Sequence, residues 1–433
     1  MTQTLFTPMT VAEMVEALTV PPIPFHITAF DGSTTGPGDA EFRFHIRDVD
    51  TLAYIATAPG DLGLARAYMT GGLEVEGEHL AHPYRIFDSL QELYECFRRP
   101  DAATMITLVR SLRHLGALKI QPLPEVERTS WWHKRIIEGL SRHSRERDKE
   151  SVSSHYDVSN DFYELFLGES MTYTCAYFPT PDATLEEAQE NKYRLIFEKL
   201  RLKEGDTLLD VGCGWGGMIR YAAQRGVRAI GVTLSEEQYE WGRQRLVREG
   251  LDHLAEIRCQ DYRDVAEEGF DAISAIGILE HVGVANYEDY LTHLYGKLTP
   301  GGLMLNHCIT YPDNRPRRAG SFIDRYIFPD AELSGSGTVI TTMQDSGFEV
   351  LHAENLRFDY MRTLHHWCEN LKDNWDEALA MVGSQTARLW GLYMAGSEWG
   401  FERNIVQLHQ VLGVKLTDDG SRGEVPERMW WKV

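Results

Sequence analysis

Apolar and polar residues alternate in two different ways along the chain, before and after about residue 150. From Ser151 onward, short apolar runs are separated by amphipathic helical stretches, which is typical of a parallel sheet with helices on both faces. An apolar run leads into Asp210, after a helix expected at about Leu185–Leu200. The later strands are expected at Arg228–Val232, Ala255–Cys259, Phe270–Ile276 and Leu303–His307. This part of the chain is therefore predicted to be an α/β doubly wound sheet.

The first 150 residues favour a small α+β unit followed by helices. The expected helices lie at about 8–19, Asp48–Ala58 and Leu62–Met69, and the expected strands at Phe25–Phe30 and Glu41–Ile46. Apolar residues then recur at helical spacing between Ala102 and Lys119, which predicts an amphipathic helix. We predict two domains, 1–150 and 151–433, with their boundary near Glu150.

The C-terminal part is less regular. A partly basic stretch, Tyr311–Gly335, follows the last expected strand, and an insertion at this place in such a sheet commonly caps a substrate pocket. Helices rich in Trp and His are expected from Thr363 onward, and a polar tail from about Thr417.

The segment LLDVGCGWGG at Leu208–Gly217 is predicted to be a buried strand that runs directly into a glycine-rich turn. Glycine lets backbone N–H groups approach a ligand closely, and the N-terminus of the following helix adds partial positive charge. This is the pattern of a nucleotide-binding turn, although a purely structural strand turn has the same form.

Polar residues follow the next two strands at the same edge of the sheet. Thr233, Leu234 and Gln238 stand where a dinucleotide-binding fold would place an acid for the ribose hydroxyls. Asp261 and Tyr262 follow the third strand, and all of these side chains are expected to converge on the glycine turn. This order resembles a class I S-adenosylmethionine (SAM) methyltransferase, which has a Rossmann-like sheet.

Composition excludes several classes of protein. The net charge of -22 argues against general nucleic-acid binding, which needs a basic surface. The six cysteines lack CxxC or metal-finger spacing, so structural zinc is not expected and reduced thiols in a cytoplasm fit better than disulfides. We find neither a signal peptide nor an uninterrupted apolar run of about 18 residues, so export and membrane spanning are not expected.

The charge is reversed in one segment. Arg98–Lys149 carries twelve Lys and Arg against six Asp and Glu, or +6, which leaves -28 for the remainder. Within it, Trp131–Lys149 combines adjacent tryptophans with six basic residues, which suits the headgroups of an anionic membrane surface. A charged linker helix packed on the next domain would have the same composition.

An acid and two histidines lie at the carboxyl edge of the sheet, at the ends of two strands. Glu280 and His281 follow the fourth strand, and His307 ends the fifth. Residues of these types can bind a metal, relay protons or satisfy each other as a core pair, and their spacing alone leaves all three open.

Seven short motifs follow one another along the second domain. They are TYTCAYF (172–178), LLDVGCGWGG (208–217), GVTLSEEQ (231–238), QDYRDV (260–265), GILEHVG (277–283), LNHCIT (305–310) and RYIFPD (325–330). In residues and in order, these motifs resemble the cyclopropane fatty acid synthase family. LGLARAYMTGG in the first domain also resembles the lipid-facing domain of longer bacterial members.

The resemblance implies methylation of an unsaturated acyl chain in membrane phospholipid. In the family, the π electrons of a cis double bond attack the SAM methyl group, and a bound bicarbonate ion removes a proton from the resulting carbocation. The resemblance maps the bicarbonate contacts onto the side chains of Glu280, His307 and Tyr360 and onto backbone groups at Cys175 and Ile309. Cys175 is thus expected to act through its backbone and not as a nucleophile.

The resemblance also assigns SAM contacts. These are Tyr173 and Thr174 near the methionine end, Gly212 and Gly214 at the turn, Thr233, Leu234 and Gln238 near the ribose, and Asp261, Tyr262 and Arg263 beside the adenine. A homodimer, peripheral on the inner face of the membrane, is expected from the family. The product is either a cyclopropane or a 10-methylene chain, the precursor that a separate reductase converts to a 10-methyl branch, and the divergent N-terminal unit favours the second.

Two other functions remain compatible with the sequence. A methyltransferase acting on a soluble small molecule would keep the glycine domain but leave the basic segment unexplained. A non-catalytic lipid-binding or scaffold protein would not need Glu280, His307 and Tyr360.

Overall fold

The computed structural model describes residues 6–127 and 159–432, except for 316, 319 and 329. The described chain forms two compact units. One contains residues up to 127 together with Gly320–Phe322 and Leu371–Gly396, and the other contains the remaining residues from 159 onward. The expected boundary near Glu150 and the tryptophan-rich segment Trp131–Lys149 lie outside the described residues.

The N-terminal unit contains a four-stranded sheet in the order β2-β1-β3-β4, where β1 and β3 are parallel and the other two pairings antiparallel. Phe25 and Phe44 meet edge to face at its centre, with ring centroids 4.5 Å apart. The helices and strands up to residue 127 are α1 (Val11–Leu18), β1 (His26–Ala29), β2 (Thr34–Thr35), β3 (Arg43–Ile46), α2 (Val49–Thr57), α3 (Asp61–Met69), β4 (Leu73–Glu76), α4 (Ile86–Cys96) and α5 (Ala102–Leu115).

The amphipathic helix expected between Ala102 and Lys119 is α5. Asp101 caps its N-terminus by accepting a hydrogen bond from the Thr104 N–H, and Gly116 ends it in the left-handed conformation. Only part of its apolar stripe is buried. Leu108 faces the core, whereas the apolar residues on its other side, Met105, Ile106 and Val109, are exposed.

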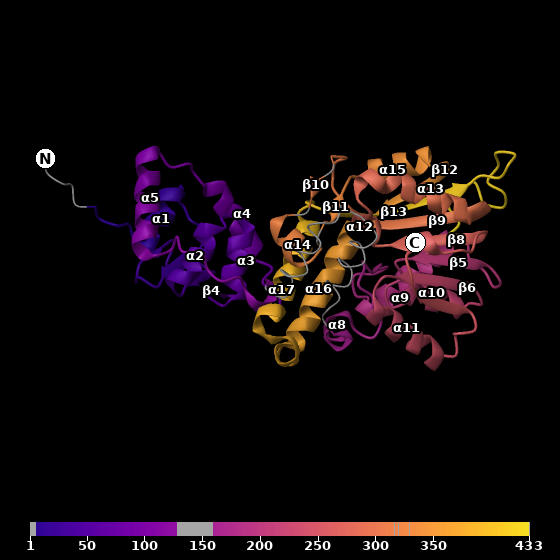
Figure 1. Ribbon diagram of the computed structural model, residues 1–433, viewed down its shortest axis with the longest axis horizontal. Coiled ribbons are helices and arrows are strands. Elements are labelled where there is room, and N and C mark those ends of the chain that lie inside the picture. Colours follow the sequence, from indigo (N-terminus) through magenta and orange to yellow (C-terminus); the bar gives the residue numbers. More distant parts are fainter. Residues whose placement is uncertain (1–5, 128–158, 316, 319, 329, 433) are drawn as a thin grey trace. The chain divides into compact units, whose positions relative to one another are not determined.

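The second unit is built on a seven-stranded sheet in the order β12-β13-β9-β8-β5-β6-β7 (Figure 1). The five strands from β9 to β7 are parallel, and β13 runs antiparallel to both of its neighbours. This confirms the predicted α/β class. The strands are β5 (Thr207–Val211), β6 (Arg228–Thr233), β7 (Ala255–Cys259), β8 (Phe270–Ile276), β9 (Leu298–Thr310), β12 (Phe348–Asn355) and β13 (Gln407–Lys415).

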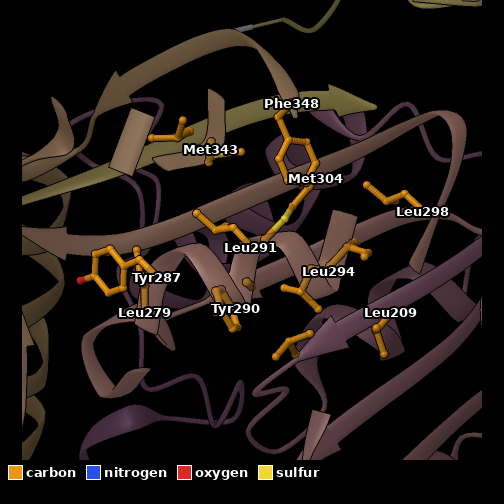
Figure 2. Packing of buried hydrophobic residues seen from close by; sticks show 14 of the residues in the cluster. Leu209, Leu279, Tyr287, Tyr290, Leu291, Leu294, Leu298, Met304, Met343 and Phe348 are labelled. Atoms are coloured by element: carbon orange, nitrogen blue, oxygen red, sulfur yellow. The ribbon is translucent and has the colours of Figure 1, made fainter. Parts of the chain in front are cut away.

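Helices cover both faces of this sheet, with α13 and α15 together on one side and α9, α10 and α11 together on the other (Figure 1). On the first side, Leu291, Leu294, Met304, Met343 and Phe348 form a continuous apolar core (Figure 2). The helices from residue 159 onward are α8 (Asn160–Leu167), α9 (Leu185–Lys199), α10 (Gly217–Ala223), α11 (Glu236–Arg248), α12 (Leu279–Val282), α13 (Tyr287–Lys297), α14 (Ser321–Tyr326), α15 (Ser336–Asp345), α16 (Arg357–Asp373) and α17 (Trp375–Glu402).

The C-terminal part differs from the sequence-based prediction. Helices were expected to continue from Thr363 to a polar tail, but after α17 the chain returns to the sheet as β13. The strand β13 is only nine residues long and mixes apolar with polar residues, and it follows a long helical stretch, so periodicity did not separate it from a helix.

The expected capping stretch forms two short strands and one helix, β10 (Arg317–Arg318), α14 and β11 (Glu332–Leu333). Within the two described ranges, no helix combines the length and the apolarity needed to cross a membrane.

Candidate functional site

The glycine-rich turn between β5 and α10 adopts a conformation that requires glycine. Gly212, Gly214 and Gly216 all have positive φ angles, of 71°, 55° and 85°. A Cβ at Gly212 would lie 2.5 Å from the Ile278 side chain, whereas the space that a Cβ at Gly214 would take is open. The turn therefore leaves an accessible stretch of backbone at the edge of the sheet.

This turn forms one wall of a pocket of about 440 Å³ within the second unit. Trp215, His281, Ile327, Phe328 and Asp330 also line it, the last three from the stretch expected to cap a substrate pocket. All ten residues assigned to SAM from the sequence line this single pocket: Tyr173, Thr174, Gly212, Gly214, Thr233, Leu234, Gln238, Asp261, Tyr262 and Arg263.

Polar side chains at the ends of β6 and β7 are held by each other. The Thr233 hydroxyl donates to Gln238 Oε1 at 2.7 Å, and both side chains are buried. The Asp261 carboxylate accepts two hydrogen bonds from the Arg263 guanidinium, at 2.8 and 2.6 Å. These two pairs fix the hydrogen-bond donors and acceptors that face the pocket. At the end of β6, the Thr233–Gln238 pair stands where a dinucleotide-binding fold would place an acid.

A buried lysine that the sequence analysis missed supports the inner end of this pocket. Lys192 Nζ, on α9, donates to Thr174 Oγ1 at 2.8 Å. Burial lowers the pKa of Lys192 to about 7 and raises the pKa of Asp210 to about 7, and the two groups interact electrostatically. Asp210, which lines the pocket, also accepts a hydrogen bond of 2.6 Å from Ser274.

Glu280 and His281 are neighbours in sequence but have different surroundings. His281 lines the pocket, whereas Glu280 is buried and accepts a hydrogen bond of 2.6 Å from the backbone N–H of Ile309. Burial raises the pKa of Glu280 to about 7. Its second oxygen, Oε2, is buried and has no partner among the described residues.

His307 lies two residues before Ile309 on β9, so both side chains point to the same face of the sheet. Burial holds the pKa of His307 well below its usual range, with further lowering by Lys192 and Lys199. Its Nδ1 is hydrogen-bonded to Gln410, but in the described part of the chain its Nε2 has no partner. The strand β9 thus carries His307 and Ile309, and the Ile309 N–H links it to Glu280 on α12.

The other two predicted catalytic residues, Cys175 and Tyr360, are both buried. The backbone N–H of Tyr360 donates to the Leu356 carbonyl at 3.0 Å, as in a helical turn, and the Cys175 Sγ lies 3.8 Å from the same oxygen. These contacts involve the backbone of Tyr360 and the thiol of Cys175, whereas the prediction concerned the side chain of Tyr360 and the backbone of Cys175. Tyr360 packs against Phe401, with ring centroids 4.5 Å apart. Burial raises the pKa of Cys175 well above its usual value, which disfavours the thiolate. The expectation that Cys175 acts through its backbone stays a prediction.

The charge of Lys192 acts on three groups described above, Asp210, Cys175 and His307. Lys192, Lys199 and Gln410 were missed because a lysine in a helix or a polar residue in a strand ordinarily faces water. The available signal was the position of both lysines beside the apolar residues of α9, which contains buried Leu195 and Ile196.

Comparison with known proteins agrees with this geometry. Residues 143–411 match the family described as mycolic acid cyclopropane synthetase. The chain is 54% identical, over 98% of its length and 99% of the relative's, to a probable fatty acid methyltransferase of Mycobacterium tuberculosis. It is 32% identical to a tuberculostearic acid methyltransferase of the same organism, over 90% of this chain and 87% of the relative.

The structural comparison agrees as well. The mycolic acid cyclopropane synthase CmaA1, solved with SAH and CTAB, aligns with a TM-score of 0.57 and 31% identity. The alignment covers 62% of this chain and 98% of that one. The chain therefore belongs to the mycolic acid cyclopropane synthetase family of SAM-dependent methyltransferases, which modify lipid acyl chains.

Proposed function

We propose that this enzyme methylates the cis double bond of an oleoyl-type acyl chain in membrane phospholipid, with a bound bicarbonate ion as the base. The product that we propose is the 10-methylene chain. The observation that carries this proposal is a pair of buried atoms beside β9, Glu280 Oε2 and His307 Nε2, which have no hydrogen-bond partner among the described residues. Leaving two such groups unpaired costs free energy, so they indicate a polar occupant.

The chemistry of these two atoms fits bicarbonate. A carboxylate oxygen can accept the bicarbonate O–H, and an imidazole N–H can donate to one of its oxygens. The Ile309 N–H, which the resemblance assigned to the ion, already donates to Glu280 and so orients that carboxyl group. Bound there, bicarbonate would supply a base whose negative charge stabilises a developing carbocation in an apolar site.

The pocket beside the glycine turn fits SAM, which supplies the methyl group when bound. The open space at Gly214 admits a ligand close to the backbone, and the Thr233–Gln238 pair provides uncharged polar atoms for ribose hydroxyls. Lys192 fixes the hydroxyl of Thr174 at the opposite end. Phe328 and Ile327 line the same pocket, where their apolar side chains would exclude water from the reacting atoms.

The exposed face of α5 supports an anionic membrane as the source of the substrate. Met105, Ile106 and Val109 present apolar surface, and Arg110 and Arg113 on the same helix are exposed beside them. Apolar side chains that enter the headgroup region, together with cations that bind anionic lipid, are the two components of interfacial binding.

The test is to incubate the purified protein with SAM, bicarbonate and vesicles of dioleoyl phosphatidylglycerol, and to analyse the acyl chains by gas chromatography and mass spectrometry. We expect an acyl group with one additional carbon, present as an exocyclic methylene branch. A saturated ring product would overturn the proposed product but not the substrate. An unchanged acyl chain, while SAM is consumed on soluble acceptors, would overturn the lipid substrate.

A further inference from the structure

A row of polar side chains crosses the antiparallel edge of the sheet, on the face that carries His307. Glu354 on β12 pairs in register with Gln410 on β13, and Gln410 pairs in register with His307 on β9. Residues opposite each other in neighbouring strands share a face, so the three side chains stand side by side. Lys199, the last residue of α9, lies against the same row.

The hydrogen bonds in this row have a fixed direction. A protonated lysine only donates, so Lys199 Nζ must donate to the oxygen of the Gln410 amide, 2.7 Å away. The amide nitrogen of Gln410 then faces His307 Nδ1 at 3.2 Å. Because that nitrogen only donates, His307 Nδ1 must accept, and the proton of the neutral imidazole must be on Nε2.

The buried position of Lys199 makes this direction hard to reverse. Its side chain is fully buried, and Nζ also forms an ion pair with Glu354 at 2.5 Å. Burial lowers the pKa of Lys199, and the Glu354 carboxylate opposes that lowering by favouring the charged form. Gln410 and His307 are each only 1% exposed, so water does not compete for their hydrogen bonds.

We infer that Lys199 and Gln410 are positioning residues that hold the proton of His307 on Nε2, so that this histidine is a fixed hydrogen-bond donor toward a buried anion. The inference rests on the proposed function for the identity of that anion. It assigns His307 a binding role and leaves removal of the substrate proton to the anion. It also explains why the residue opposite His307 is a buried glutamine.

The first test reads the tautomer directly. The imidazole ¹⁵N resonances of the wild-type protein, labelled at its 16 histidines, would be recorded without substrate, and His307 would be assigned from the signals lost in H307N. We expect Nδ1 to be unprotonated and Nε2 to carry the proton. A proton on Nδ1 in the wild type would overturn the inference, and this measurement does not depend on catalytic activity.

The second test reverses one hydrogen bond with almost no change of shape. In Q410E a carboxylate replaces the donor amide, so we expect Nδ1 of His307 to become protonated and turnover on lipid to fall about a hundredfold. SAM affinity should stay unchanged. The matched control is Q407E on the same strand, where Gln407 contacts Asn404 and not His307. An Nδ1 that stays unprotonated in Q410E would overturn the inference.

A further pair of variants tests the lysine. E354Q keeps the bond from Lys199 to Gln410 and should keep the wild-type tautomer. The double variant K199M/E354Q removes both charges together and should give a mixture of the two His307 tautomers. A wild-type spectrum in the double variant would show that Lys199 is not a positioning residue. If wild-type protein fails to methylate any lipid while these spectra are as expected, the proposed function fails and the positioning role stands.

Discussion

The two halves of the central sheet contribute to the site in different ways. In the parallel half, β5 to β7, the pocket is shaped by backbone conformation, above all by glycines with positive φ angles. In the half that includes β9, β13 and β12, buried polar side chains form hydrogen bonds across neighbouring strands. The first half depends mainly on glycines, which leave room for a ligand, and on polar pairs at the strand ends. The second half depends on a buried row of polar side chains.

This difference indicates how each half tolerates change. An added methyl group in the glycine turn occupies space that the pocket or its wall needs, whereas exchange of one polar atom beside β9 leaves the shape intact and reverses or deletes a hydrogen bond. Variants can therefore separate affinity for the methyl donor from turnover.

The largest effect is expected from E280Q. The amide keeps an oxygen for the Ile309 N–H, but its nitrogen cannot accept a hydrogen bond from the ion that we propose beside it. Turnover on oleoyl phospholipid should fall about a thousandfold with SAM affinity unchanged, as measured by kinetics and calorimetry. E288Q, at an exposed position on α13, is the matched control and should retain wild-type turnover. Equal turnover in the two variants would contradict the role of Glu280.

The same pair of variants sharpens the comparison through stability. Burial raises the pKa of Glu280 from 4.5 to about 7, so its contribution to stability is complete below pH 4.5 and is lost as the pH rises through 7. In bicarbonate-free buffer, E280Q should unfold like wild type at pH 4 but be more stable at pH 8, by up to about 3 kcal/mol. Urea denaturation at both pH values measures this, and a difference that does not change with pH would contradict it.

A smaller effect is expected in the parallel half. G212A places a Cβ at a φ of 71° and against Ile278, which should distort the turn and lower SAM affinity about tenfold, or about 1.4 kcal/mol. G296A, in α13, adds the same methyl group where no atom of the described residues lies within 4 Å of it, and should leave SAM affinity unchanged. Calorimetric titration with SAM compares them. Equal affinities would mean that the conformation of Gly212 does not limit binding.

The smallest effect is expected in the N-terminal unit, which is not part of the seven-stranded sheet. V109E adds a negative charge to the exposed apolar face of α5 and should weaken sedimentation with anionic vesicles roughly fivefold, or about 1 kcal/mol. V247E, at an exposed position on α11, is the control with the same change of charge. If both variants bind vesicles equally, α5 is not the membrane surface.

Sequence reasoning predicted the half of the sheet from β5 to β7 better than the half that includes β9, β13 and β12. Each of the strands from β5 to β7 ends in the turn or polar residues that face the pocket, so Gly212, Thr233 and Asp261 were expected together from chain order. The contacts of His307 were not predictable in this way. Gln410 lies more than 100 residues further along the chain, on a strand that the periodicity did not separate from the preceding helices. The pattern of residues along a segment predicts the conformation of that segment. The row formed by Glu354, Gln410 and His307 depends instead on which strands become neighbours in the sheet.

The position of β13 has a consequence for biosynthesis. Because β13 lies between β12 and β9, a growing polypeptide that has emerged only as far as β9 has formed the glycine turn but still exposes an unpaired strand edge. At translation rates of about 5–20 residues per second, roughly ten seconds pass before Gln410 follows. During that interval the nascent chain is exposed to edge-to-edge association and to capture by chaperones, and the histidine that the last strand orients has not yet met its partner.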